Sequence, residues 1–296
     1  MRWMGRRLDS SKIFPAGHAG LAARFVMLRD GITVRVIETV GADPAAPPVL
    51  LLSGWGTSAY LWRRNLLPLA AARLRPIAVE LKGQGLSDIP TDPREYTLES
   101  LSRHVLDVLD ALHVERAMLA GLSLGGGIAA RVALLAPERV ERLALLSSVG
   151  LGRVHLVHLA GLLPEMLVAP LTPHLARRSL FELALRWAYG TLGHPTAADV
   201  DQYFVHSEDP AFARSLWSLV RRVDWRMLRA DELRRLEMPV LAIFGTRDRI
   251  VSPHHVGELV RQLPRGELVL IEGAGHACAE EAPEAVNRAL VDFLVA

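Results

Sequence analysis

The pentapeptide Gly121-Leu122-Ser123-Leu124-Gly125 decides the fold of this 296-residue chain. It follows an apolar run over 117–120, which is typical of a buried strand, and precedes a helix expected to begin near Gly126. A serine on such a tight strand-to-helix turn adopts a strained backbone, and its neighbours two residues away must be small. The turn lifts the hydroxyl clear of the sheet and directs the positive end of the helix towards it. We therefore predict that Ser123 is a nucleophile, with Gly121 and Gly125 as the small residues of the turn.

Short apolar runs on both sides of this turn predict further strands, because continuous apolar strands suit a parallel sheet covered by helices on both faces. Two runs, 24–28 and 32–38, flank Arg29-Asp30-Gly31, which is typical of a hairpin turn. The others lie at 49–52, 77–81, 117–120, 143–146, 240–245 and 268–271. Helical patterns alternate with them, clearest over 98–112, near 254–263 and over 283–294. We expect an α/β fold with a doubly wound, mostly parallel eight-stranded sheet and an antiparallel hairpin at its start.

Residues 151–236 break this alternation. They are rich in Leu, Ala, Arg and Trp, and helical stripes occur there, such as Leu180, Leu183, Ala184, Trp187 and Ala188. No strand is expected in this region. The predicted organisation is a core domain formed by 1–150 and 237–296, with 151–236 as a helical insertion.

Serine needs a base to take its proton, and that base needs an acid to orient it. His276, in Gly273-Ala274-Gly275-His276, follows the strand that ends near Ile271, and Asp248 follows the strand over 240–244. The carboxyl ends of parallel strands form one edge of the sheet, where such folds place their sites. We therefore predict that Ser123, Asp248 and His276 act together. Other acids lie near the histidine but follow no strand of their own: Glu272, Glu280 and Glu281.

A negatively charged oxygen that develops on the substrate needs two backbone N–H donors. One is expected from Leu124, the residue after the nucleophile. The other is expected from Trp55, in the loop Ser53-Gly54-Trp55-Gly56-Thr57 that follows the strand over 49–52. The Trp55 side chain would then form a wall of the acyl pocket.

These motifs in register resemble the α/β-hydrolase fold superfamily, and in particular its lidded serine esterase-like members. The resemblance covers nearly the whole chain and implies that 151–236 is a helical cap (lid) inserted after strand 6. Two supporting positions depart from the family pattern: Ser53-Gly54 stands where His-Gly is usual, and Glu80 opens the stretch Glu80-Leu81-Lys82-Gly83-Gln84-Gly85-Leu86-Ser87 in place of Asp. Both departures put the local loop geometry and the substrate preference in question more than the reaction.

Composition excludes several other classes. Half of the residues are hydrophobic, so disorder is excluded, and the single cysteine, Cys278, excludes an intrachain disulfide framework and is expected to be buried. Of the 34 basic residues 32 are arginines, scattered among acids at a net charge of +2, which argues against nucleic-acid binding. His254-His255 and the pair His155 and His158 lack a carboxylate or thiol at ligating intervals, and Gly125-Gly126-Gly127 lacks a nucleotide-binding pattern. No metal and no cofactor is expected.

No long uncharged apolar run predicts a membrane span, and Asp9 to Lys12 stand where a secretory signal would need its apolar stretch. A cytoplasmic protein is therefore expected, and a homodimer stays open. The expected reaction is hydrolysis of a small to medium hydrophobic ester through an acyl-enzyme. Two alternatives remain: the same residues could act on a C–C, thioester, lactone or amide bond, or the chain could be a ligand receptor with weak turnover. Arg186 could bind a substrate carboxylate, although an outward ion pair is the favoured interpretation.

Overall fold

The structure is a computed structural model that describes residues 10–154 and 177–296. Its main sheet has eight strands in the order β1-β2-β4-β3-β5-β6-β8-β10. Their bounds are β1 Leu21–Met27, β2 Thr33–Thr39, β3 Pro48–Leu52, β4 Arg75–Glu80, β5 Ala117–Leu122, β6 Val140–Leu146, β8 Val240–Gly245 and β10 Gly266–Ile271. β2 runs antiparallel to β1 and β4, and the remaining neighbours pair in parallel. The predicted eight-stranded, mostly parallel sheet is thus confirmed.

Helices connect these strands. The α-helices of the described ranges are α1 Leu66–Ala71, α2 Leu98–Ala111, α3 Leu124–Leu135, α7 Arg178–Ala188, α8 Ala197–Phe204, α9 Pro210–Arg222, α10 Ala230–Arg234, α11 Val256–Val260, α12 Cys278–Glu281 and α13 Pro283–Val295. Short 3₁₀ turns add η1 Ser10–Lys12, η2 Ala59–Trp62, η3 Pro93–Tyr96, η4 Pro137–Arg139 and η5 Val205–Glu208. The predicted helix over 98–112 is confirmed, whereas the one expected over 254–263 is shorter. None of the described helices is long and apolar enough to span a membrane.

The sheet separates two apolar cores, because successive side chains of a strand point to opposite faces. On β3, Leu50 and Leu52 pack with α2 and α3, whereas Val49 and Leu51 pack with α1 and α13. All four are fully buried. An apolar run without alternation therefore marks a strand covered on both faces, which is why the sheet could be predicted from short Leu- and Val-rich segments.

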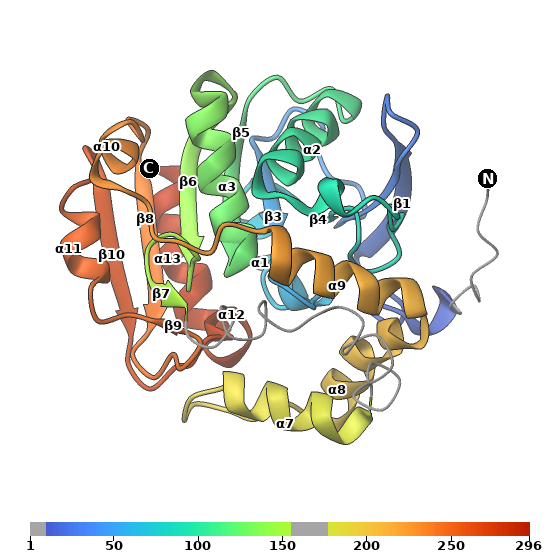
Figure 1. Cartoon of the computed structure of the whole chain (residues 1–296). Coiled ribbons are helices and arrows are strands. Elements are labelled where there is room, and N and C mark those ends of the chain that lie inside the picture. Colours follow the sequence, from blue (N-terminus) through green and yellow to red (C-terminus); the bar gives the residue numbers. More distant parts are fainter. Residues whose placement is uncertain (1–9, 155–176) are drawn as a thin grey trace.

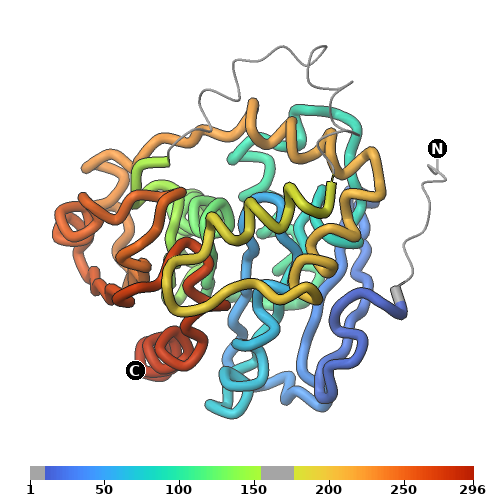
Figure 2. Tube along the Cα trace, turned by 90° about the horizontal axis from the view of Figure 1, so that it is seen from below, coloured from blue at the N-terminus to red at the C-terminus, as the bar shows by residue number. Residues whose placement is uncertain are grey.

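The helices α7, α8 and α9 lie beyond the carboxyl ends of the parallel strands (Figure 1). Seen from that side, their tubes cross in front of the strand ends (Figure 2). Together with α10 they occupy the chain between β6 and β8. The part of the proposed cap over 155–176, which includes His155 and His158, lies outside the described residues, as does Asp9 near the amino end.

One expectation for this region is wrong, since 151–236 contains a strand. β7, Arg153–Val154, pairs in an antiparallel manner with β9, Val251–Ser252, and forms a separate two-stranded sheet. Two residues are too few to produce a periodic apolar pattern. The pairing depends on a segment almost a hundred residues away in the sequence, so no local signal could have indicated it.

A buried ionic cluster joins α8 to η2 and α12. Arg63, just after η2, forms ion pairs with Asp199 on α8, at 2.7 Å, and with Glu280 on α12. The hydroxyl of Tyr60 donates to Asp199 at 2.7 Å, and that of Tyr203 donates to Glu280 at 2.9 Å. Arg63 therefore joins α8 to α12, and removal of either carboxylate takes a partner from a buried cation.

Asp199 also forms a capping box with Thr196 at the start of α8. Its carboxylate accepts the N–H of Thr196, and the Thr196 hydroxyl accepts the N–H of Asp199. Burial alone would raise the pKa of Asp199, but the hydrogen bonds from Tyr60 and Thr196 and the charge of Arg63 outweigh it, so the pKa is lowered. A lowered pKa means that the carboxylate stabilises the fold above its ordinary pKa of about 4 and loses that effect as the pH falls further.

We predict that Asp199→Ala lowers the free energy of unfolding by about 2–4 kcal/mol at neutral pH, because it removes a helix cap and one partner of a buried cation. The matched control is Asp201→Ala on the same helix, whose carboxylate is 60% exposed and pairs with Arg178 at the surface. That change is expected to cost less than about 1 kcal/mol. Urea unfolding at pH 7 and at pH 3 measures both. The difference between the two variants should shrink at the lower pH, and equal losses at pH 7 would contradict the assignment.

Candidate active site

Ser123 lies at a sharp turn between β5 and α3. Its backbone has φ +57° and ψ −119°, a left-handed conformation that costs a residue with a side chain about 1–3 kcal/mol. The turn is tighter than the sequence indicated, because β5 continues to Leu122 and α3 begins at Leu124. Its carbonyl accepts the N–H groups of Gly126 and Gly127, which begin the helix, and of Val149 after β6. The strained conformation is therefore fixed by neighbours on two elements.

Close backbone contacts leave no room for a side chain at Gly121 or Gly125. A methyl group at Gly121 would overlap the carbonyl of Gly125, and one at Gly125 would overlap the carbonyl of Leu52 at the end of β3. The first contact closes the turn on itself, and the second presses it against the neighbouring strand. Neither position therefore has room for a side chain in this backbone.

His276 and Asp248 lie together. Nδ1 of His276 is 2.9 Å from Oδ2 of Asp248, and the other carboxylate oxygen accepts the N–H groups of Ile250 and Val251 at 2.8 and 2.9 Å. Both side chains are at least nine-tenths buried. The carboxylate therefore has its orientation fixed by the backbone that follows β8, and it fixes the imidazole ring in turn. Glu280 pairs with Arg63, so it does not compete for the histidine.

The loop that carries His276 is joined to the end of α7. The N–H of His276 donates to the carbonyl of Ala188 at 2.7 Å, and the N–H of Thr191 donates to Gly273 at 2.7 Å. Glu281 reinforces this contact, because its two carboxylate oxygens accept the N–H groups of Gly190 and Gly275 at 2.7 and 2.9 Å. Burial raises the pKa of Glu281, although both N–H donors oppose that effect. Segments from both sides of the proposed cap boundary thus hold the histidine loop.

The end of β6 contacts both the turn that contains Ser123 and the segment that follows His276. The N–H of Ser123 donates to Leu146, and the hydroxyl of Ser147 lies 3.9 Å from the sulfur of Cys278, two residues after His276. In the described part of the chain, no hydrogen bond joins Ser123 to His276. Hydrogen bonds of this kind are often long in enzymes without substrate.

The loop after β3 lies directly against Ser123. A methyl group at Gly54 would be 3.2 Å from Cβ of Ser123. Among the described residues, the backbone N–H groups of Trp55 and Leu124 donate to no protein acceptor. The Trp55 side chain is 44% exposed, and its indole N–H donates to the carbonyl of Leu216 on α9 at 3.0 Å. Both N–H groups predicted to stabilise the oxyanion are therefore free of protein acceptors in the described residues. The loop that contains Trp55 is bound to α9 through the indole group.

Both departures from the family pattern have local partners. The hydroxyl of Ser53 donates to the carbonyl of Ser58 at 2.9 Å and closes the loop. The carboxylate of Glu80 accepts the N–H groups of Ala59 and Leu86, at 3.3 and 2.8 Å, and pairs with Arg35 at 3.3 Å. Glu80 therefore connects the loop after β3 to the loop after β4.

Three residues that were not predicted for the site each contact one of its loops: Gln84, Thr57 and Glu281. The only sequence signal was the position of Gln84 inside the Gly-x-Gly stretch after β4 and that of Glu281 shortly after His276. Cys278 is fully buried as expected, and burial raises the pKa of its thiol to about 12. Arg186 pairs with Glu182 on its own helix at 2.9 Å and is 53% exposed, which confirms the outward ion pair.

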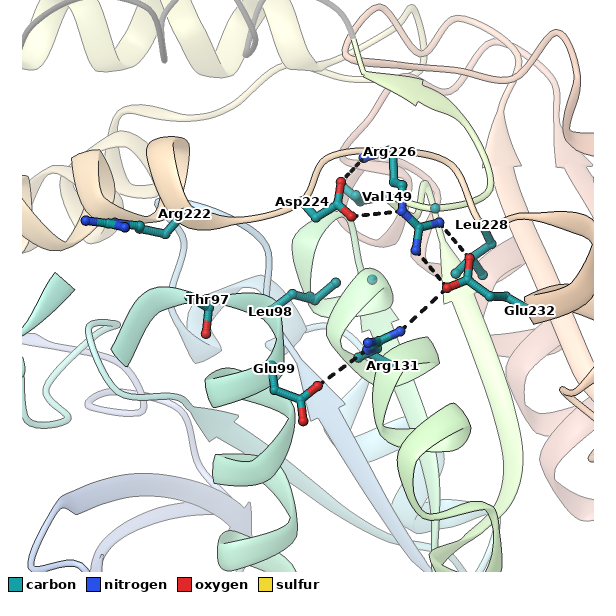
Figure 3. A pocket seen from close by; sticks show the side chains of 12 residues that line it. Thr97, Leu98, Glu99, Arg131, Val149, Arg222, Asp224, Arg226, Leu228 and Glu232 are labelled. Atoms are coloured by element: carbon teal, nitrogen blue, oxygen red, sulfur yellow. Dashed lines mark hydrogen bonds and ion pairs between the residues drawn. The ribbon is translucent and has the colours of Figure 1, made fainter. Parts of the chain in front are cut away.

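A separate cavity of about 230 Å³ lies between α2, α3 and the segment from Arg222 to Glu232 (Figure 3). Arg226 lies between Asp224 and Glu232, and Arg131 bridges Glu99 and Glu232. Ser123, Asp248 and His276 are not among its described lining residues. Because these charges compensate one another, the cavity has no evident preference for a charged ligand.

Comparisons with known proteins identify the family of the chain. Residues 47–283 match the family model described as the alpha/beta hydrolase fold. The chain is 30% identical over 285 residues to a 2-hydroxy-6-oxononadienedioate/2-hydroxy-6-oxononatrienedioate hydrolase of Cupriavidus pinatubonensis, spanning 92% of this chain and 95% of that protein. It is 28% identical over 265 residues to the carboxylesterase YbfK of Bacillus subtilis, spanning 84% of this chain and 80% of that protein. The crystal structure of that carboxylesterase superimposes with a TM-score of 0.73 at 24% identity, covering 93% of this chain and 91% of the other.

We predict that Gly125→Ala lowers the free energy of unfolding by about 1–3 kcal/mol or more, because the added methyl group would force β3 and the turn apart. The control is Gly193→Ala, where a methyl group meets no atom within 4 Å. That variant is expected to unfold at the same urea concentration as the parent. Equal stability of Gly125→Ala and the parent would show that the close approach of Leu52 is not a constraint.

Proposed function

The chain belongs to the α/β-hydrolase fold family, and we propose that it is a serine hydrolase that cleaves a small to medium hydrophobic carboxylic ester. The observation that carries the proposal is the hydrogen bond between His276 and Asp248, at 2.9 Å, on the sheet edge where Ser123 occupies its strained turn. An imidazole held by a carboxylate at one nitrogen can act as a base at the other.

In the first half-reaction, Nε2 of His276 takes the proton of the Ser123 hydroxyl while the serine oxygen attacks the ester carbonyl. The carbonyl oxygen becomes negatively charged, and the N–H groups of Trp55 and Leu124 donate to it. Asp248 stabilises the imidazolium. The imidazolium then gives its proton to the alcohol oxygen as the C–O bond breaks, which leaves the acyl group on Ser123.

In the second half-reaction, water takes the place of the alcohol. His276 removes a proton from the water, the hydroxide attacks the acyl carbonyl, and the same two N–H groups stabilise the new oxyanion. Ser123 then leaves with the proton from His276, and the carboxylic acid is released. All groups return to their starting state, so the cycle requires no cofactor.

Apolar groups beside the loop after β3 support a hydrophobic substrate. A methyl group at Gly56 would meet the Leu216 side chain of α9 at 3.9 Å, so an apolar side chain lies beside this loop. Apolar pockets bind apolar acyl or alcohol groups by removing their surface from water. The similarity to a protein named as a carboxylesterase supports the same bond type.

Hydrolysis of a C–C bond by the same residues is the second candidate, supported by the similarity to the Cupriavidus hydrolase, whose name specifies a dioate substrate. The ion pair of Arg186 with Glu182 weakens this candidate, because it occupies the side chain that could have bound a substrate carboxylate. A receptor with weak turnover is the third. A receptor needs a ligand-binding pocket but no carboxylate that orients a histidine, so the bond between Asp248 and His276 argues against this candidate.

We predict that Ser123→Ala lowers kcat on any ester that the parent cleaves by at least about 10⁴-fold, since loss of the nucleophile removes the acyl-enzyme route. A fluorophosphonate probe should label the parent and not the variant. Ser148→Ala is the control, because Ser148 is a buried neighbour whose hydroxyl donates to the carbonyl of Val149, and it should be labelled like the parent. Absence of labelling on folded parent protein would favour the receptor.

Substrate preference is tested separately on a panel of acyl esters of graded chain length, together with thioesters and diketone compounds. The apolar surroundings of the oxyanion loop predict the highest kcat/KM for esters with hydrophobic acyl or alcohol groups. Highest activity on a highly charged ester would contradict this preference. Highest activity on the diketones would favour the C–C bond candidate.

A further inference from the structure

The carbonyl group of Gly54 has an unusual number of partners for a loop residue. It accepts the side-chain amide of Gln84 at 3.1 Å and the hydroxyl of Thr57 at 2.9 Å, and the N–H of Thr57 adds a longer contact at 3.4 Å. A carbonyl oxygen has two lone pairs, so the two side chains are enough to satisfy it. The direction of this C=O bond is therefore fixed.

The same peptide group contains the N–H of Trp55. The peptide bond is planar and, between Gly54 and Trp55, trans, so the C=O and N–H bonds point in opposite directions. Fixing the carbonyl on one side fixes the N–H on the other. Gly54 itself lies against Ser123, and the N–H of Trp55 has no protein acceptor among the described residues.

Gln84 is itself held in place. Its side chain is almost fully buried, and its Oε1 accepts the N–H of Leu81 at 3.3 Å, which orients Nε2 towards Gly54. Its backbone N–H donates to Leu81 at 2.9 Å, and its carbonyl accepts the N–H of Ser87 at 3.1 Å. Since these bonds close a tight turn after β4, Gln84 holds Gly54 from a rigid support.

We propose that Gln84 and Thr57 are positioning residues that aim the N–H of Trp55 at the oxygen of the substrate that becomes negatively charged. The inference rests on the proposed function, because it assigns a purpose to a geometry beside Ser123. Neither residue touches the substrate. The Trp55 indole stays bound to Leu216, so without these two donors the loop keeps its place while its peptide group can rotate. The loss is therefore confined to the step in which the oxyanion forms.

Gln84→Met and Thr57→Val test this, because each keeps the approximate size of the side chain and removes its donor to Gly54. Each single variant should lower kcat on a cleaved ester about 10- to 100-fold with KM changed less than about threefold, a smaller loss than removal of an oxyanion donor itself. The inhibition constant of a trifluoromethyl ketone, which forms a hemiketal oxyanion on serine, should rise by the same factor. Binding of the matching unreactive methylene analogue should not change.

The matched control is Ser215→Ala. Its hydroxyl is buried and donates at 3.0 Å to the carbonyl of Gly83, next to Gln84 in the chain, but it does not contact Gly54. This variant should retain the parent values of kcat and of the trifluoromethyl ketone inhibition constant, even where its thermal midpoint falls. If Gln84→Met does not fold, Thr57→Val carries the test alone.

The outcomes separate the two proposals. A parent that cleaves esters and accepts the fluorophosphonate label, with Gln84→Met and Thr57→Val within twofold of Ser215→Ala in kcat and in ketone inhibition, overturns the positioning role and leaves the serine hydrolase intact. A rise in KM equal to the fall in kcat/KM also overturns it, because the residues would then act on substrate binding. A parent that neither cleaves nor is labelled overturns the proposed function, and the positioning role with it.

Discussion

The left-handed backbone of Ser123 is the constraint on which the rest of this structure depends. It is possible because Gly121 and Gly125 have no side chains. A side chain at Gly121 would overlap the carbonyl of Gly125, and one at Gly125 would overlap the carbonyl of Leu52. Three N–H groups, from Gly126, Gly127 and Val149, hold the Ser123 carbonyl. These hydrogen bonds, from α3 and from the segment after β6, offset the backbone strain of about 1–3 kcal/mol. The strand β5, which precedes Ser123, is buried along its whole length.

That constraint also locates everything around it. Since β3, β6, β8 and β10 run parallel to β5 or to one another, their carboxyl ends lie at one edge of the sheet, and the loops that follow them lie at the same edge as the serine. The helices between β6 and β8 are bound to the same loops, through Trp55 and Leu216 on one side and through His276 and Ala188 on the other. The proposed cap therefore stabilises the loops of the candidate site as well as covering their edge of the sheet.

Sequence alone could predict the strands and the meeting of His276 with Asp248, because both depend on local patterns: an apolar run, a glycine-rich turn and a position after a strand. It could not predict the Arg63 cluster, whose partners Asp199 and Glu280 lie 136 and 217 residues further along the chain. It could not predict β7 either, since that strand forms only by pairing with β9. Gln84 could be seen as part of a motif, but its bond to Gly54 depends on how two loops approach each other in space.

The two departures from the family pattern can be understood from the same approach of loops. A serine at 53 closes its own loop through Ser58, and the carboxylate of Glu80 occupies space that exists because Gly85 has no side chain. Glu80 then binds Ala59 in one loop and Leu86 in the other, and its charge is compensated by Arg35. Glu80 therefore joins the loop after β3 to the loop after β4, and the bond from Gln84 to Gly54 connects the same two loops. Under the positioning role proposed for Gln84, Glu80 would support the direction of the Trp55 N–H group, because it holds together the two loops that contain Gln84 and Gly54.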